Sequence, residues 1–108
     1  MNRYFQFNKP IFSTMILSLI IFLSGCGKPQ SEMTGEELFD EFCAGCHKST
    51  GKGNFLLGVP ANRGTKLSYW EIKLKIKRGS GGDSKMPVFN NLTDTEAGKI
   101  AEYLMFLK

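Results

Sequence analysis

Histidine, cysteine and long apolar runs are all scarce in this chain of 108 residues. It has one histidine, His47, and three cysteines, a poor supply for a structural zinc site with four ligands. Two histidine ligands from one copy of this chain to one metal ion are impossible. The apolar run at 11–23 is shorter than the roughly 20 residues that a spanning helix needs. No internal repeat is present, so what remains is room for one small domain.

Net charge is also small once the N-terminus is set aside. The chain carries 14 Lys and Arg against 10 Asp and Glu, a formal net charge of +4. If the first residues are a signal peptide that is removed, as argued below, Arg3 and Lys9 are lost and the net charge falls to +2. A charge this small gives no argument for a nucleic-acid partner. A group of cations lies late in the chain, at Lys73, Lys75, Lys77, Arg78 and Lys85. This group would either steer acidic partners or form a solvated helix face.

The N-terminus has the pattern of a bacterial export signal. Residues 1–10 carry two cations, and the apolar run follows them. Small residues then precede Cys26 in the sequence Leu-Ser-Gly-Cys, which resembles the lipobox of bacterial lipoproteins. The resemblance implies cleavage before Cys26, a lipid on its sulfur, and an extracytoplasmic position on a bacterial membrane, on the periplasmic side or at the cell surface. The alternative is an uncleaved signal anchor with an ordinary Cys26.

Three segments follow from this pattern. They are a lipoprotein signal peptide at 1–25, a lipidated N-terminus with a short linker at 26–33, and a folded domain at 34–108. A fully extended linker reaches roughly 25 Å at about 3.5 Å per residue, which would keep the domain near membrane-bound or membrane-adjacent partners. A domain this small buries little core of its own, so we expect it to need a bound cofactor to fold.

The sequence Cys-Ala-Gly-Cys-His at 43–47 is the most informative stretch. Two thiols three residues apart, followed at once by an imidazole, form the attachment signature of a c-type haem. On a helix, positions i and i+3 share a face, so Cys43 and Cys46 can reach one edge of a porphyrin while His47 reaches the iron. A thioredoxin-like site would need a βαβ surrounding, which the sequence before Cys43 does not predict. We therefore predict one haem c, covalently held by Cys43 and Cys46.

The second iron ligand must be a different residue type, because His47 is the only histidine. Methionine is the natural choice, since its thioether favours ferrous iron and raises the reduction potential. Met33 lies in the linker and Met105 on the last predicted helix, whereas Met86 ends a glycine-rich loop and precedes a proline. Met86 is the predicted ligand, and the alternative is a methionine that merely fills the core.

Helices are predicted at both ends of the domain. Thr34 with Glu37, and Thr93 with Glu96, have the spacing of capping boxes that begin helices. The segment 68–78 is ambiguous, since its apolar residues fit a strand period and a helical period. Within that segment, Trp70 is expected in the core.

The glycine-rich loop at 48–66 carries an unusual apolar group. Phe55, Leu56, Leu57 and Val59 are too apolar for a free loop, so we expect them to press on the haem. Pro60 could offer its carbonyl oxygen to the far nitrogen of His47, which would orient the ring. The alternative for Pro60 is an ordinary turn.

Together these features resemble the class I cytochromes c. The resemblance rests on Gly35-x-x-x-Phe39-x-x-x-Cys43-Ala-Gly-Cys46-His47, on Met86-Pro87-Val88-Phe89, and on a final helix with Tyr103-Leu104. It implies an all-α cytochrome c fold, with three to four helices and loops around one covalent haem and with the first and last helices crossing near Gly35. It also implies His47 and Met86 as axial ligands, and a helix at 68–78. One departure is Lys48, where the family often has glycine.

The function predicted on these grounds is one-electron transfer by a membrane-tethered monohaem cytochrome, an electron carrier and not an enzyme. Its partners would be redox proteins in or near the membrane. Two alternatives stay open: a haem c subunit of a larger respiratory oxidase or dehydrogenase complex, and a haem-based sensor of small ligands.

Overall fold

The computed structural model describes residues 27–81 and 86–108. The predicted signal, the proposed lipid on Cys26 and the cation Lys85 lie outside these residues. The described elements are η1 (Gln30–Glu32), α2 (Gly35–Phe42), α3 (Ala44–His47), η2 (Phe55–Leu57), α4 (Tyr69–Arg78) and α5 (Asp94–Phe106). Within the described ranges no strand forms, and only Asn54 and Val59 make an isolated bridge. The all-α prediction is confirmed.

A capping box begins each of the three longer helices. The hydroxyl oxygens of Thr34, Ser68 and Thr93 each accept a backbone N–H three residues later, and the glutamate there accepts the cap's own N–H. The box at Ser68 resolves the ambiguous segment as α4, which ends at Gly79 with a φ of 67°. Local capping chemistry therefore decides between the two periods that the side chains fit.

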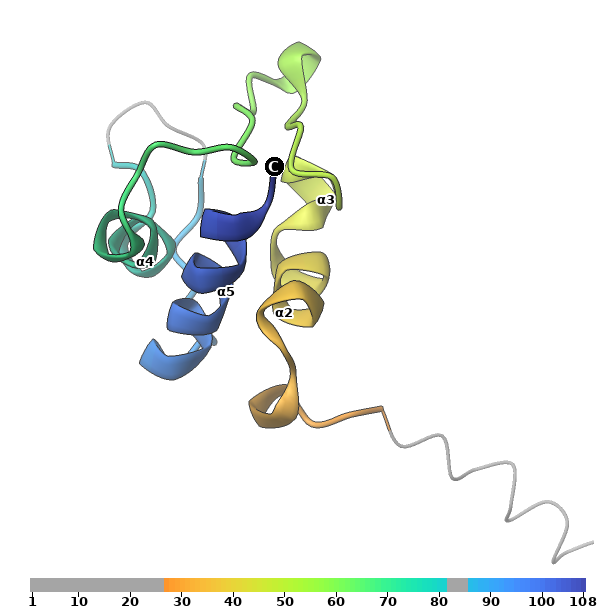
Figure 1. Ribbon diagram of the computed structural model, residues 1–108, viewed down its shortest axis with the longest axis vertical. Helices are drawn as coiled ribbons and strands as arrows, with labels where there is room; N and C mark the ends of the chain where they lie inside the picture. The colour runs from red at the N-terminus through yellow and green to blue at the C-terminus, as the bar shows by residue number, and fades with distance from the viewer. Residues whose placement is uncertain (1–26, 82–85) are drawn as a thin grey trace, which may run out of the picture.

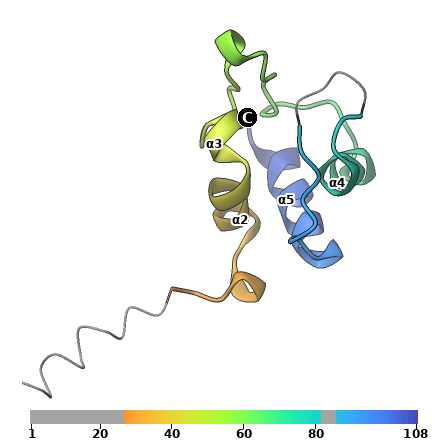
Figure 2. The ribbon, with the colours of Figure 1, turned by 180° about the vertical axis from the view of Figure 1, so that it is seen from behind.

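Helix α5 lies between α2 and α4 and contacts both (Figures 1 and 2). The core between these helices is apolar and fully buried, with Phe39, Leu38, Leu92 and Ile100 as its largest side chains. At Gly35 the backbones of α2 and α5 come very close, because a Cβ there would lie 2.1 Å from the carbonyl oxygen of Lys99. The predicted crossing of the first and last helices near Gly35 is confirmed.

Residues before α2 do not form a free linker. The side-chain amide of Gln30 donates to the carbonyl oxygen of Asn91 and to the carboxylate of Glu96, both at 3.0 Å. The ammonium of Lys99 donates to the carbonyl oxygens of Ser31 and Met33 at 3.1 and 2.9 Å. Residues 30–33, which we call the N-terminal strap, are therefore bonded to the rest of the domain and are not fully extended.

Two expectations about apolar side chains are wrong. Phe55 and Leu56 are 95% and 91% exposed, and neither lines the cavity described below. Trp70 is 70% exposed because it lies two residues before Ile72, on the side of α4 away from the buried Ile72 and Ile76. Among the helices of the described residues, none is long and apolar enough to cross a bilayer.

Two members of the cation group make specific contacts within the domain. Lys73 pairs with Asp94, and Lys77 donates to the carbonyl oxygen of Leu92 at 2.8 Å, so both tie α4 to the start of α5. Lys75 is exposed and lines a cavity that is partly open to solvent. These three residues therefore make specific contacts or line a site, and do not form one uniform solvated face.

Candidate cofactor-binding site

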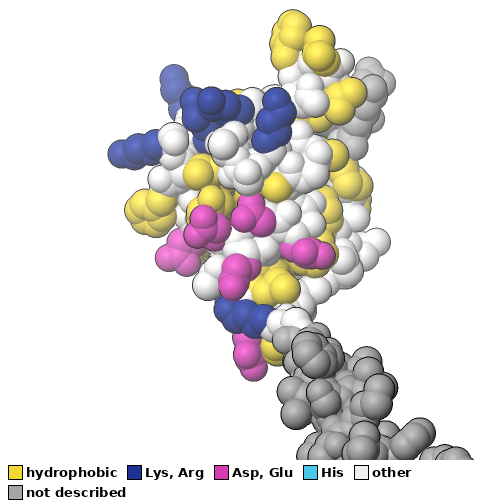
Figure 3. Space-filling view, turned by 90° about the vertical axis from the view of Figure 1, so that its right-hand side faces the viewer, with side chains coloured by type: hydrophobic (Ala, Val, Ile, Leu, Met, Phe, Trp, Pro, Cys, Tyr) yellow, Lys and Arg dark blue, Asp and Glu magenta, His cyan; other side chains and the backbone are white. Residues whose placement is uncertain are grey.

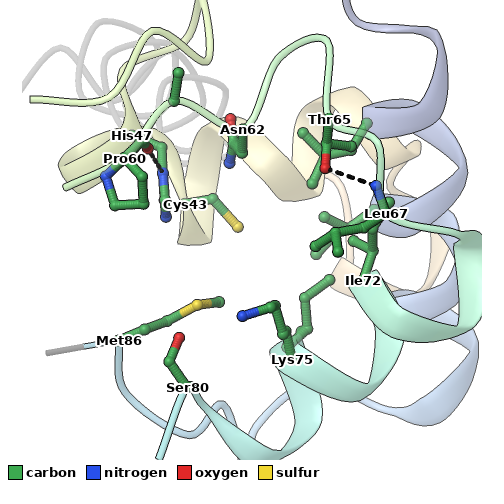
Figure 4. A pocket seen from close by; sticks show the side chains of 14 residues that line it. Cys43, His47, Pro60, Asn62, Thr65, Leu67, Ile72, Lys75, Ser80 and Met86 are labelled. Carbon is green, nitrogen blue, oxygen red and sulfur yellow. Dashed lines mark hydrogen bonds between the residues drawn. The ribbon is translucent and has the colours of Figure 1, made fainter. Parts of the chain in front are cut away.

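A cavity lies where α3, α4, α5 and the two long loops meet (Figure 4). It holds about 700 Å³ of space not filled by atoms, part of it open to solvent. Its apolar wall comes from the core, mainly from Leu67, Ile72, Ile76, Ile100 and Leu104. Cys43, His47, Pro60 and Met86 also line it, so the fold gathers predicted site residues that are 43 positions apart in the sequence.

The cysteine pair sits at the junction of α2 and α3. Cys43 is the last residue before α3, is 7% exposed, and turns its sulfur into the cavity (Figure 4). Burial raises the pKa of its thiol to about 12, with the nearby Cys46 adding to the effect. A thiol this hard to ionise is a poor redox nucleophile and a poor zinc ligand. Cys46 is exposed, and the two cysteines form no disulfide.

His47 is oriented from behind by the loop that follows it. Its Nδ1 lies 3.1 Å from the carbonyl oxygen of Pro60. A carbonyl oxygen only accepts, so Nδ1 carries the proton and Nε2 keeps a lone pair free to bind a metal. The predicted bond to Pro60 is therefore present, and Pro60 is more than an ordinary turn residue.

Glycine permits the loop to return close to His47. The N–H of Gly53 donates to the carbonyl oxygen of His47 at 2.9 Å. Gly53 has a φ of 70°, and a Cβ there would lie 2.5 Å from the Pro60 carbonyl group. Lys48, where the family often has glycine, takes a φ of 60°. The backbone accepts this strained conformation of a lysine while keeping the approach to His47.

Met86 lies on the opposite wall of the cavity from His47 and Cys43. Its thioether extends into the cavity (Figure 4). Close packing positions the segment, because a Cβ on Gly79 would lie 2.8 Å from the Met86 carbonyl oxygen. Met105, by contrast, is half-exposed on α5, and Met33, the last residue of the strap, packs against the core. Only Met86 of these three lines the cavity.

Polar groups on the cavity wall were not recognised as site residues from the sequence. They come from Asn62, Thr65, Lys75 and Ser80, and among the described lining residues none carries a carboxylate. The Lys75 ammonium and the Ser80 hydroxyl point into the cavity (Figure 4). The Oδ1 of Asn62 is buried with no hydrogen-bond partner among the described residues. No periodicity marks these positions, so only the folded chain reveals them.

This lining suits a largely apolar group that bears anionic substituents. Lys75, Ser80 and the amide of Asn62 can all donate hydrogen bonds, while the other walls are hydrocarbon. Haem c has this character, with a flat apolar ring, two carboxylate side chains and an iron that takes a nitrogen and a thioether ligand. The residues present therefore fit the cofactor that the Cys-Ala-Gly-Cys-His sequence predicts.

An all-α domain with this motif at the wall of such a cavity defines a c-type cytochrome domain. The model of the family described as cytochrome c oxidase, cbb3-type, subunit III, matches residues 30–104. The chain belongs to that family and has a cytochrome c fold. No curated protein matches the chain.

Proposed function

We propose that this chain is a monohaem c-type cytochrome that transfers single electrons and stands tethered to a membrane. The observation that carries the proposal is the placement of His47 and Met86 on opposite walls of one cavity, with Cys43 beside His47. Cys43 and Cys46 would hold haem c through thioethers, and His47 and Met86 would be its axial ligands. When bound, the haem supplies a reversible Fe(III)/Fe(II) couple.

The protein's part in this function is to hold the ligands in place. Pro60 fixes the tautomer and the orientation of the His47 ring. A hydrogen bond of this kind also raises the basicity of the ring nitrogen that binds the metal. With His47 and Met86 both bound, the iron would have no position left for a substrate. This arrangement supports electron transfer over catalysis or ligand sensing.

Replacing Met86 with alanine tests the assignment. We expect the ferric holoprotein to lose its weak near-infrared charge-transfer band, the reduced form to bind carbon monoxide, and the reduction potential to fall. Met105→Ala is the matched control, because Met105 is half-exposed and outside the cavity lining. An unchanged Met86→Ala spectrum would exclude this ligand. Rapid carbon monoxide binding by the unaltered protein would favour a sensor.

The membrane tether is proposed from the sequence around Cys26. A lipid on this residue would attach the domain next to the strap, on the extracytoplasmic side of a bacterial membrane. Mass spectrometry of the purified protein tests it, because the N-terminal peptide should begin at Cys26 and carry acyl chains. A peptide that begins at Met1 would contradict the proposal.

The family match favours a second candidate, a haem c subunit that stays within a larger oxidase complex. The two candidates predict different sizes in mild detergent. A free carrier should separate from other membrane proteins during size-exclusion chromatography, whereas a subunit should elute with a complex that consumes oxygen.

A further inference from the structure

Three apolar side chains stand in solvent at the end of a tight loop. Phe55, Leu56 and Leu57, which we call the apolar tip, are 95%, 91% and 60% exposed. Most large apolar side chains that a small protein exposes are scattered singly, whereas a contiguous group marks an interaction site. The tip is also the segment that the sequence analysis wrongly placed against the haem.

Backbone hydrogen bonds hold the tip in shape. Asn54 and Val59 exchange two bonds of 2.9 Å at its base, and the N–H of Leu57 donates to the Asn54 carbonyl oxygen at 3.1 Å. Gly58 closes the turn with a φ of 68°, which favours glycine. The three side chains are therefore presented on a defined turn, and little ordering would be needed when a partner covers them.

The base of the tip is part of the wall that orients His47. On one side, Gly53 bonds to the backbone of His47, and on the other, Val59 leads into Pro60, which bonds to the imidazole. Pro60 and Asn62 then line the cavity itself. A partner that held the tip would thus contact the loop that orients His47.

Charge and position indicate what kind of partner this is. Figure 3 shows Lys and Arg side chains gathered toward the end of the molecule that carries the tip, and Asp and Glu below them toward the strap. The acidic side chains of α2 are Glu36, Glu37, Asp40 and Glu41. The tip lies at the far end of the domain from Gly27, where the described chain begins (Figure 1).

We propose that the apolar tip is the docking element for a redox partner protein that has an apolar pocket bordered by carboxylates. This inference rests on the proposed electron-transfer function. A bilayer fits less well, since a lipid on Cys26 would place the membrane at the opposite end. A side-on arrangement with the acidic side chains of α2 toward the same membrane would be opposed by its anionic surface.

The test uses the full-length holoprotein and solubilised membranes from cells that make it. Chemically reduced protein is mixed with these membranes in non-ionic detergent, and its reoxidation is followed as a function of its concentration. The variant is Phe55→Ser/Leu56→Ser, and the control is Trp70→Ser, which removes an equally exposed aromatic side chain from α4. We expect the variant to raise KM at least about tenfold, as for loss of interface anchors, with kcat unchanged. The control should match the unaltered protein.

Several results would overturn the proposal. One is an equal KM for the tip variant and the unaltered protein. A second is that the protein binds protein-free vesicles of equal phosphatidylglycerol and phosphatidylcholine, and that the tip substitutions abolish this binding. The tip would then be a lipid-binding element. A third is that light scattering detects a dimer and that the substitutions dissociate it. The tip would then be a contact between two copies of the chain. If the unaltered protein is not reoxidised at all, the electron-transfer proposal is refuted as well. If only the docking proposal is wrong, the unaltered protein is still reoxidised, with kcat unchanged.

Discussion

Gly35 offers the most direct test of how the helices set the cavity. It is the first residue of α2, and a Cβ there would lie 2.1 Å from the Lys99 carbonyl oxygen and 3.0 Å from the Tyr103 Cβ. The atoms in the way belong mainly to the backbone of α5, so no side-chain rotation can relieve the clash. In Gly35→Ala, α2 must move away from α5.

The cost can be estimated from general values. Forcing an extra methyl group into a packed contact costs about 1–3 kcal/mol, and a backbone contact this short lies at the upper end. Alanine returns about 1 kcal/mol as the better helix former. The net loss is about 2 kcal/mol, which for a domain this small lowers the melting temperature by roughly 8–16 °C.

Thermal and urea unfolding of the holoprotein would measure this loss. The control is Gly45→Ala, a glycine inside α3 where a Cβ would meet nothing within 4 Å. It should unfold at the temperature of the unaltered protein or slightly higher. If Gly35→Ala and Gly45→Ala unfold at the same temperature, the close crossing of α2 and α5 does not limit stability and the reasoning is wrong.

Three further predictions concern the cavity and the helix caps. Lys75→Met should lower the reduction potential by roughly 40 mV, or about 1 kcal/mol, because a cation on the wall of the haem cavity would favour the reduced form; redox titration at low salt measures it, with Arg78→Met as control. The hydrogen bond from Lys28 and the backbone N–H of Thr34 lower the pKa of Glu37 from 4.5 to about 2. The stability that ionised Glu37 contributes is complete above its pKa in the unfolded chain and is lost as pH falls from about 4.5 toward 2. The melting temperature of Glu37→Gln should therefore depend less on pH over that range. Protein prepared without haem should show no cooperative melt in calorimetry, because the cavity walls would lose their filling.

The sequence predicts the parts of the fold that depend on local chemistry. Thr34 and Thr93 mark helix starts because a capping box needs only four residues, and the attachment motif is readable because its chemistry is contiguous. Met86 could be singled out because few alternatives exist in so short a chain. Its place on the cavity wall follows from packing against Gly79, which no local pattern encodes.

Other features depend on contacts between distant residues. The apolar residues of the tip looked like buried ones because hydrophobicity alone does not say which way a loop turns. Their direction is set by the bridge from Asn54 to Val59 and the bond from Gly53 to His47. Nothing in the sequence sets Asn62 apart, and Lys75 stands out only as one of the late cations, yet the loop and α4 bring both to one cavity.

The strap would limit how freely the domain moves on its proposed membrane tether. Lys99 holds the carbonyl groups of Ser31 and Met33, and Gln30 reaches both Asn91 and Glu96, so the chain is fixed to α5 within a few residues of Cys26. A lipid on Cys26 would then restrict the distance of the domain from the bilayer and its orientation relative to the bilayer, as a long flexible linker would not. Because the apolar tip lies at the other end of the domain, the same restriction would keep the tip directed away from the bilayer, toward a partner that stands above it. The strap and the tip thus fit one arrangement, in which the first limits the orientations that the second must search.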